Sequence, residues 1–161
     1  MSIGYLSQNG MNAVFNQWSV TDPNINQYGF GQLYKENGEP KILQVYPGMW
    51  VNPQNTEVTL LTIRRTYQII IYDLIYLAAD GTSNQNKIVS DCEEIAFRLI
   101  RFLRLRSELL DIVGTPTVGP FSDKFLDAVS GVIINIVVET NGESEDCEDP
   151  DYNFYIKSNE I

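Results

Sequence analysis

The sequence contains no histidine, and basic residues are scarce: 11 Lys and Arg stand against 21 Asp and Glu, for a net charge of −10. Without histidine, a serine or cysteine nucleophile would need another base, and neither cysteine has a lysine at motif spacing. The sequence also lacks a phosphate-binding loop and a dinucleotide-binding fingerprint. We therefore predict that the protein is not an enzyme, uses no cofactor and has no hydrolytic activity of its own.

The scarcity of positive charge and of cysteine argues against two further classes of protein, nucleic-acid-binding proteins and secreted disulfide-rich proteins. An acidic chain does not bind nucleic acid by neutralising phosphates unless its basic residues gather on one face. The two cysteines, Cys92 and Cys147, are too few for a secreted disulfide framework, so we expect two reduced thiols. Residues 1–10 have neither a basic start nor an apolar run, and no segment approaches the roughly 20 apolar residues of a membrane span. We expect no signal peptide and no membrane association.

A chain of 161 residues predicts a single domain, residues 1–161, with an acidic C-terminal extension from about residue 140. No Lys or Arg lies between Lys124 and Lys157. The acidic residues of this region are Glu139, Glu143, Glu145, Asp146, Glu148, Asp149 and Asp151. We interpret them as a solvated loop or extension, followed by a short extended piece, Tyr152 to Ile156.

The stretch from Thr66 to Leu77 predicts a long strand, because β-branched and aromatic residues dominate it. Both of its faces are apolar, which is typical of a strand in the middle of a structure. One face carries Tyr67, Ile69, Ile71 and Ile75, and the other carries Ile70, Tyr72, Leu74 and Tyr76. Asp73 interrupts this apolar run, and an unpaired charge there is costly. We expect an arginine partner for it: Arg64, Arg65 or an arginine of the following helix.

A long helix follows, beginning near Asn86 or Ser90. Ser90 with Glu93 makes a capping-box pattern, and apolar residues recur at helical spacing from Ile88 to Phe102. We interpret the neighbouring carboxylates Glu93 and Glu94 as part of the first helical turn. The helix is expected to end near Leu110 to Val113, because Gly114 and Pro116 follow.

Other helices and strands are expected before and after this long strand and helix. Met11, Val14, Phe15 and Trp18 share one side of a short N-terminal helix that Asp22-Pro23 ends. Asn37-Gly38 predicts a hairpin turn between a strand from Tyr28 to Tyr34 and a strand from Lys41 to Tyr46.

The remaining segments complete the fold class. Val58 to Leu77 is one long strand or two strands bent at Arg64-Arg65, and Pro116 to Pro120 is an irregular connection. Phe125 to Glu139 is again a strand, with Gly131 as a possible bulge. This order predicts an α+β fold: a mostly antiparallel sheet with a long helix and a short N-terminal helix packed on it.

The arginines gather where the rest of the chain is acidic. Arg98, Arg101, Arg104 and Arg106 fall on one helical stretch. One interpretation is a solvated helix face whose side-chain stems cover apolar surface. The other is a contact surface for the acidic C-terminal stretch of another copy, because opposite charges at distant parts of one sequence suit a head-to-tail interface that closes into a ring.

Several short motifs, in this order, resemble a known family. They are INQYGFG at 25–31, VYPGMWV at 45–51, YQIIIYD at 67–73, IVSDC at 88–92 and DAVSGV at 127–132. Over roughly residues 20 to 140, the chain resembles the structural neck and tail proteins of tailed bacteriophages of Bacteroidetes hosts, including crAss-like phages. The resemblance implies a small α+β subunit, similar to tail-terminator or head–tail connector proteins, and brings no catalytic residues with it.

The resemblance also implies partners and a location. It implies a sixfold or twelvefold homo-oligomeric ring around the DNA channel, beside portal, connector or other tail proteins. The subunit would be assembled in the host bacterial cytoplasm and would reside in the neck or tail of the virion. An acidic bore suits DNA that passes without specific binding, because it repels phosphates. The interface candidates are Arg98, Arg101, Arg104, Arg106, Tyr72, Tyr76 and Asp73.

Two alternatives from other classes stay open. One is a monomeric binding module in which the acidic loop, Glu143 to Asp151, takes up Ca²⁺, although that loop lacks the spaced ligands and glycine of a calcium loop. The other is an enzyme that works through carboxylates alone. No metal-ligand motif is present, so we assign no metal site.

Overall fold

The computed structural model describes residues 6–32, 35, 36, 39, 40, 45–122 and 128–142. The chain folds as α+β, with a five-stranded mixed sheet in the order β1-β4-β5-β7-β6 and a separate two-stranded sheet, β2-β3. Only β1 pairs in parallel, with β4, so the larger sheet is mostly antiparallel. The elements are α1 (Gln8–Thr21), β1 (Gln27–Phe30), β2 (Lys35–Glu36), β3 (Glu39–Pro40), β4 (Gly48–Val58), β5 (Thr62–Leu74), α2 (Gln85–Arg104), β6 (Asp111–Ser122) and β7 (Val129–Asn141).

The N-terminal helix is where the apolar spacing predicts it. Ser7 caps α1, and its side chain accepts a hydrogen bond from the Gly10 backbone N–H. The predicted apolar side is confirmed, since all of its members are buried: Met11, Val14, Phe15 and Trp18. Asp22 ends the helix with extended backbone, as expected before a proline.

Strand β5 is the central strand of the larger sheet, as its two apolar faces predict. Tyr67, Ile69 and Ile71 belong to the main core on one face. Ile70 and Tyr72 belong to a second, smaller cluster on the other face. A strand buried on both sides can present apolar groups at successive positions, which is why its sequence does not alternate with polar residues.

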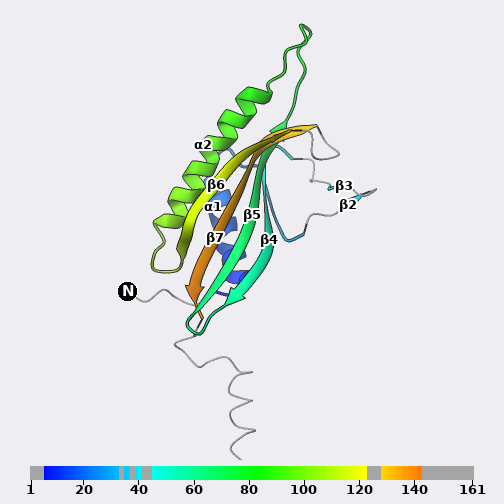
Figure 1. Cartoon of the computed structure of the whole chain (residues 1–161). Helices are drawn as coiled ribbons and strands as arrows, with labels where there is room; N and C mark the ends of the chain where they lie inside the picture. Colours follow the sequence, from blue (N-terminus) through cyan, green and yellow to red (C-terminus); the bar gives the residue numbers. More distant parts are fainter. Residues whose placement is uncertain (1–5, 33–34, 37–38, 41–44, 123–127, 143–161) are drawn as a thin grey trace, which may run out of the picture.

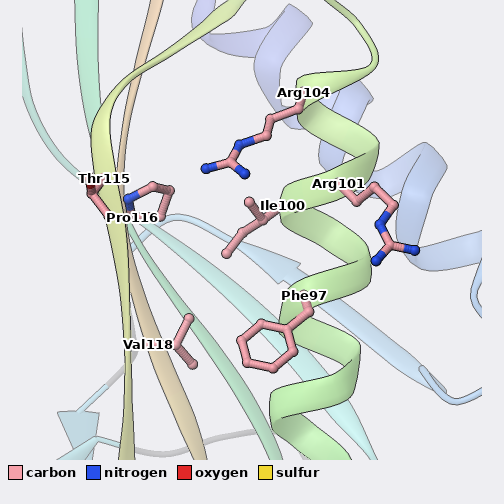
Figure 2. Close-up of a pocket in the computed structure, with 7 residues that line it drawn as sticks. All are labelled: Phe97, Ile100, Arg101, Arg104, Thr115, Pro116 and Val118. Atoms are coloured by element: carbon pink, nitrogen blue, oxygen red, sulfur yellow. The ribbon is translucent and has the colours of Figure 1, made fainter.

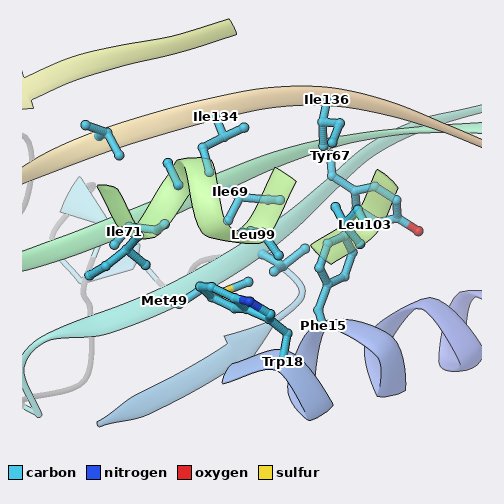
Figure 3. Close-up of a cluster of buried hydrophobic side chains, with 14 of the residues drawn as sticks. Phe15, Trp18, Met49, Tyr67, Ile69, Ile71, Leu99, Leu103, Ile134 and Ile136 are labelled. Atoms are coloured by element: carbon cyan, nitrogen blue, oxygen red, sulfur yellow. The ribbon is translucent and has the colours of Figure 1, made fainter. Parts of the chain in front are cut away.

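The main core joins one face of the sheet to side chains of both helices (Figure 3). Leu99 and Leu103 of α2 lie over Ile134 and Ile136 of β7 and Ile69 of β5, and Phe15 of α1 packs edge-on against Tyr67 with ring centroids 5.2 Å apart. Figure 1 shows α2 running along the sheet on one side. Side chains of this size contribute about 1.5–3 kcal/mol each on full burial, so this core accounts for most of the stability.

The second cluster lies on the opposite face, near one end of the sheet. Its buried members are Ile70, Tyr72, Phe121 and Val129. The Tyr46 ring packs edge-on against Tyr72, with centroids 5.9 Å apart. The rest of this face is more polar, and Arg64 pairs there with Glu139 through Nε and Oε2 at 2.6 Å.

The long strand and the helix have other boundaries than the sequence predicts. The chain turns at residues 59–61, where the Thr59 N–H donates to the Thr62 carbonyl, so Arg64-Arg65 is not the bend. Strand β5 ends at Leu74, before the predicted end at Leu77, and Leu77 forms an isolated bridge with Ser83. Helix α2 begins at Gln85, one residue before the first predicted start; the alternative at Ser90 is wrong.

The C-terminal end of α2 is also a correction. The helix ends at Arg104 instead of Leu110 to Val113, and tight turns follow in which the Arg106 N–H donates to the Leu103 carbonyl. The buried Leu110 then leads directly into β6. Gly114, with φ at +71°, lies where the register of β6 against β7 shifts, so this glycine allows a strand irregularity and does not end the helix.

Residues 116–120 are likewise not an irregular connection. They belong to β6, an edge strand, where proline is tolerated because one side of the strand needs no ladder partner. Gly131 is not a bulge, since it pairs in regular register with Tyr72 and Phe121. The last large strand, β7, covers Val129–Asn141, and residues 125–127 of the expected strand lie outside the described part.

The short strands β2 and β3 pair in antiparallel register, Lys35↔Pro40 and Glu36↔Glu39, and the predicted turn residues Asn37 and Gly38 lie outside the described part. Strand β3 lies just before the predicted return strand, of which residues 41–44 lie outside the described part and residues 45 and 46 are not in a strand. The Tyr28 region does not pair with it, because β1 pairs in parallel with β4.

A buried carboxylate connects the two helices. The Asp22 side chain is 5% exposed, and its oxygens accept hydrogen bonds from Arg98 Nε at 3.0 Å and from the Asn24 N–H at 2.9 Å. Removing it leaves the Asn24 N–H without this acceptor and Arg98 without its counter-charge. Asp22→Ala should therefore lower the free energy of unfolding by about 1–3 kcal/mol in urea titration.

Asp91→Ala is the matched control for that measurement. Asp91 pairs with Lys87 one turn away on α2, and both side chains are largely exposed. Exposed pairs of this kind contribute about 0–1 kcal/mol, so the control should change little. Equal losses in the two variants would contradict the proposed role of Asp22.

Candidate functional site

The predicted arginine cluster separates into two groups. Arg98 belongs to the fold through Asp22, and the Arg106 guanidinium lies 4.2 Å from the centroid of the Phe102 ring, a cation–π geometry. Arg101 and Arg104 are exposed, and neither has an ion-pair partner among the described residues. The structure thus leaves two of the four predicted arginines for an external partner.

Arg101 and Arg104 border a groove between α2 and the edge strand β6, which we call the α2–β6 groove (Figure 2). Its volume is about 340 Å³, and its lining residues are Phe97, Ile100, Arg101, Arg104, Thr115, Pro116 and Val118. Figure 2 shows the Arg104 side chain extending toward β6, whereas the Arg101 side chain extends from the side of the helix that faces away from β6. Phe97 is 53% exposed although it is aromatic.

The chemistry of the groove is that of a docking surface. Its floor is apolar, from Phe97, Ile100 and Val118, and its charged groups are guanidinium groups. The residues that line it in the described part of the chain include no nucleophile with a base and no carboxylate. Such a surface suits an occupant that combines apolar side chains with negative charge.

Asp73 does not have the arginine partner that we predicted. Arg64 pairs with Glu139, and the buried Arg65 donates to the Leu6 carbonyl at 2.8 Å. Asp73 accepts a hydrogen bond from the Leu74 N–H at 2.8 Å and lines a cavity of about 250 Å³ next to α2. Arg98 lines the same cavity but pairs with Asp22. A half-buried position with access to this cavity explains how the charge is tolerated.

The two predicted interface tyrosines have different environments. Tyr72 is fully buried in the second cluster, so it belongs to the fold of the subunit itself. Tyr76 is 64% exposed on the loop between β5 and α2, and its N–H donates to Asn84 Oδ1 at 2.7 Å. Of this pair, only Tyr76 is exposed to a neighbouring molecule.

Exposed leucines are the feature that the sequence reasoning missed. Leu60, 91% exposed, and Leu61 lie in the turn between β4 and β5, beside the exposed Val58. Leu77, 78% exposed, lies beside Tyr76 in the loop before α2. Figure 1 shows that turn and that loop at opposite ends of the sheet, with the loop projecting beyond α2. The only sequence signal for this turn is the pair of threonines, Thr59 and Thr62, that flanks the leucines. The β-branched and apolar residues on both sides resemble one continuous strand, which hides the turn.

The remaining candidate groups do not assemble a reactive site among the described residues. Glu93 and Glu94 lie in the third turn of α2, not in its first turn as predicted. No group of three or more potential metal ligands occurs in the part of the chain described here. Burial, with Asp73 and Asp91 nearby, raises the pKa of the Cys92 thiol to about 12, so this thiol stays protonated at neutral pH. Cys147 and the acidic stretch 143–151 lie outside the described residues.

Neither a protein-family model nor a curated protein matches the chain. Among the described helices, none has the length and apolar character needed to cross a membrane.

Proposed function

We propose that this chain is a virion structural protein that assembles into a homo-oligomeric ring in the neck or tail of a tailed bacteriophage. Its role would be that of a head–tail connector or tail-terminator-like subunit around the DNA channel, without catalytic activity. The observation that carries the assembly part is the exposure of large apolar side chains at two separate places: Leu60 and Leu61 in one, Tyr76 and Leu77 in the other. Clustered exposed apolar groups are typical of contact surfaces.

The separation of these two surfaces favours a head-to-tail contact. One surface precedes β5 in the chain and the other comes after it. Because β5 has 13 residues, the strand between them is roughly 40 Å long. In a head-to-tail contact, one surface of a subunit meets the other surface of its neighbour, and the contact repeats around a ring or along a filament, whereas a two-fold dimer would form both contacts within one pair. In the proposed phage structure these contacts close into a ring with sixfold or twelvefold symmetry.

The charge of the chain is compatible with the proposed location. With a net charge of −10, a ring of such subunits repels DNA phosphates instead of holding them. The resemblance of the five short motifs supplies the phage part of the proposal. We further propose that the long helix and the short N-terminal helix stiffen the sheet, and that neighbouring portal, connector or tail proteins are the axial partners.

Light scattering of the purified full chain after size-exclusion chromatography tests the proposal. We expect one mass at a fixed multiple of the 18.3 kDa subunit. Raising salt should weaken assembly only modestly, because exposed ion pairs contribute about 0–1 kcal/mol each. A protein that stays monomeric at high concentration and is absent from virions of its source would contradict the proposal. A monomer that binds Ca²⁺ in titration would favour the binding-module alternative.

A further inference from the structure

We propose that the α2–β6 groove is the docking site for the acidic and aromatic C-terminal segment, residues 143–156, of a neighbouring copy. This inference rests on the ring proposal and assigns one of its contacts. The groove is an interaction surface with an apolar floor and two arginines that have no ion-pair partner among the described residues. The occupant is a segment of this same chain.

The composition of the segment complements the groove. It has the sequence ESEDCEDPDYNFYI, in which acidic residues precede three aromatic residues and an isoleucine. Carboxylates suit the guanidinium groups of Arg101 and Arg104, and aromatic side chains suit the floor formed by Phe97, Ile100 and Val118. Because exposed ion pairs contribute little, the aromatic part supplies most of the affinity and the acidic part sets the register.

The way in which the chain leaves the sheet favours a neighbour's segment over the chain's own. Val118 of the groove pairs with Ile134 of β7. Strand β7 continues for seven residues beyond Ile134 and ends at Asn141, away from the groove. The Gly142 N–H then donates to the Leu61 carbonyl at 2.9 Å, on the β5 side of β7, whereas the groove lies on the β6 side. To reach its own groove, the segment would have to reverse its direction and pass from the β5 side of β7 to the β6 side.

Disulfide trapping in the full chain tests this contact, because Cys147 lies inside the proposed segment and provides one thiol. Thr115→Cys places the second thiol on the exposed rim of the groove. Glutathione disulfide accepts the two electrons when the two thiols join. We expect intermolecular disulfides between residues 115 and 147, seen on non-reducing gels and located by mass spectrometry, at a rate about tenfold above the control.

The control is Ala13→Cys, which places a thiol on the exposed side of α1, outside the groove. Arg101→Glu with Arg104→Glu should reduce the trapping, whereas Lys87→Glu on the same helix should not. Equal trapping at positions 13 and 115, or disulfides within one chain only, would overturn the inference. Light scattering separates this failure from failure of the ring proposal, since rings without trapping contradict only the docking contact.

Discussion

Gly131→Ala is expected to lower the free energy of unfolding by about 3 kcal/mol, a large loss for a single methyl group. A Cβ atom at Gly131 would clash with the Ile71 carbonyl oxygen and would lie 2.9 Å from the Tyr72 Cα. Both are backbone atoms of the central strand, so the contact is relieved only by separating β5 from β7. Urea unfolding followed by circular dichroism measures the loss.

Gly119→Ala is the matched control, because Gly119 lies on the adjacent strand β6 and its new methyl group would meet no atom within 4 Å beyond the neighbouring residues of the chain. Its effect should stay within about 1 kcal/mol, since the substitution also restricts the unfolded chain. Equal destabilisation by the two substitutions would contradict the close approach of β5 and β7 at Gly131.

The triple variant Leu60→Ser, Leu61→Ser and Leu77→Ser is expected to abolish assembly without lowering the stability of the subunit. Full burial of a leucine side chain contributes about 1.5–3 kcal/mol. Losing two or more of them should weaken each subunit contact by a factor of about 100 or more. In the isolated subunit these side chains are already exposed, so folding loses little. Light scattering and urea unfolding measure the two effects separately.

Val20→Ser is the control for exposure alone, because Val20 is 79% exposed on α1, away from both leucine sites. The triple variant should also impair assembly more than Arg101→Glu with Arg104→Glu. Tyr72→Ser is not a test of assembly, since Tyr72 is fully buried and its loss would unfold the subunit. If the leucine variants assemble like the parent chain, the apolar contacts that we propose are not the ones that hold the ring.

Apolar periodicity was sufficient to predict the elements that form the main core. The spacing of Met11, Val14, Phe15 and Trp18 specifies one helix face, and the two apolar faces of β5 specify a central strand. The predicted element boundaries are wrong where glycine or proline can serve two different structural roles. Gly114 and Pro116 are typical of a helix end but here lie in an edge strand, and Gly131 marks a close strand contact instead of a bulge.

The candidate site was only partly predictable because it depends on which groups already have partners. Sequence spacing places four arginines on one stretch, but the pairing of Arg98 with Asp22 joins residues 76 apart in the chain. The α2–β6 groove likewise exists only because β6 returns beside the helix. The exposed leucines were concealed by a turn that has neither glycine nor proline to mark it.

Electron microscopy of the purified full chain is the most direct test of the central claim that the chain forms a closed ring. We predict particles of one size with a central opening and a single rotational symmetry, sixfold or twelvefold. Open filaments in place of rings would contradict this account, as would particles no larger than one subunit at every protein concentration together with absence of the protein from virions of its source.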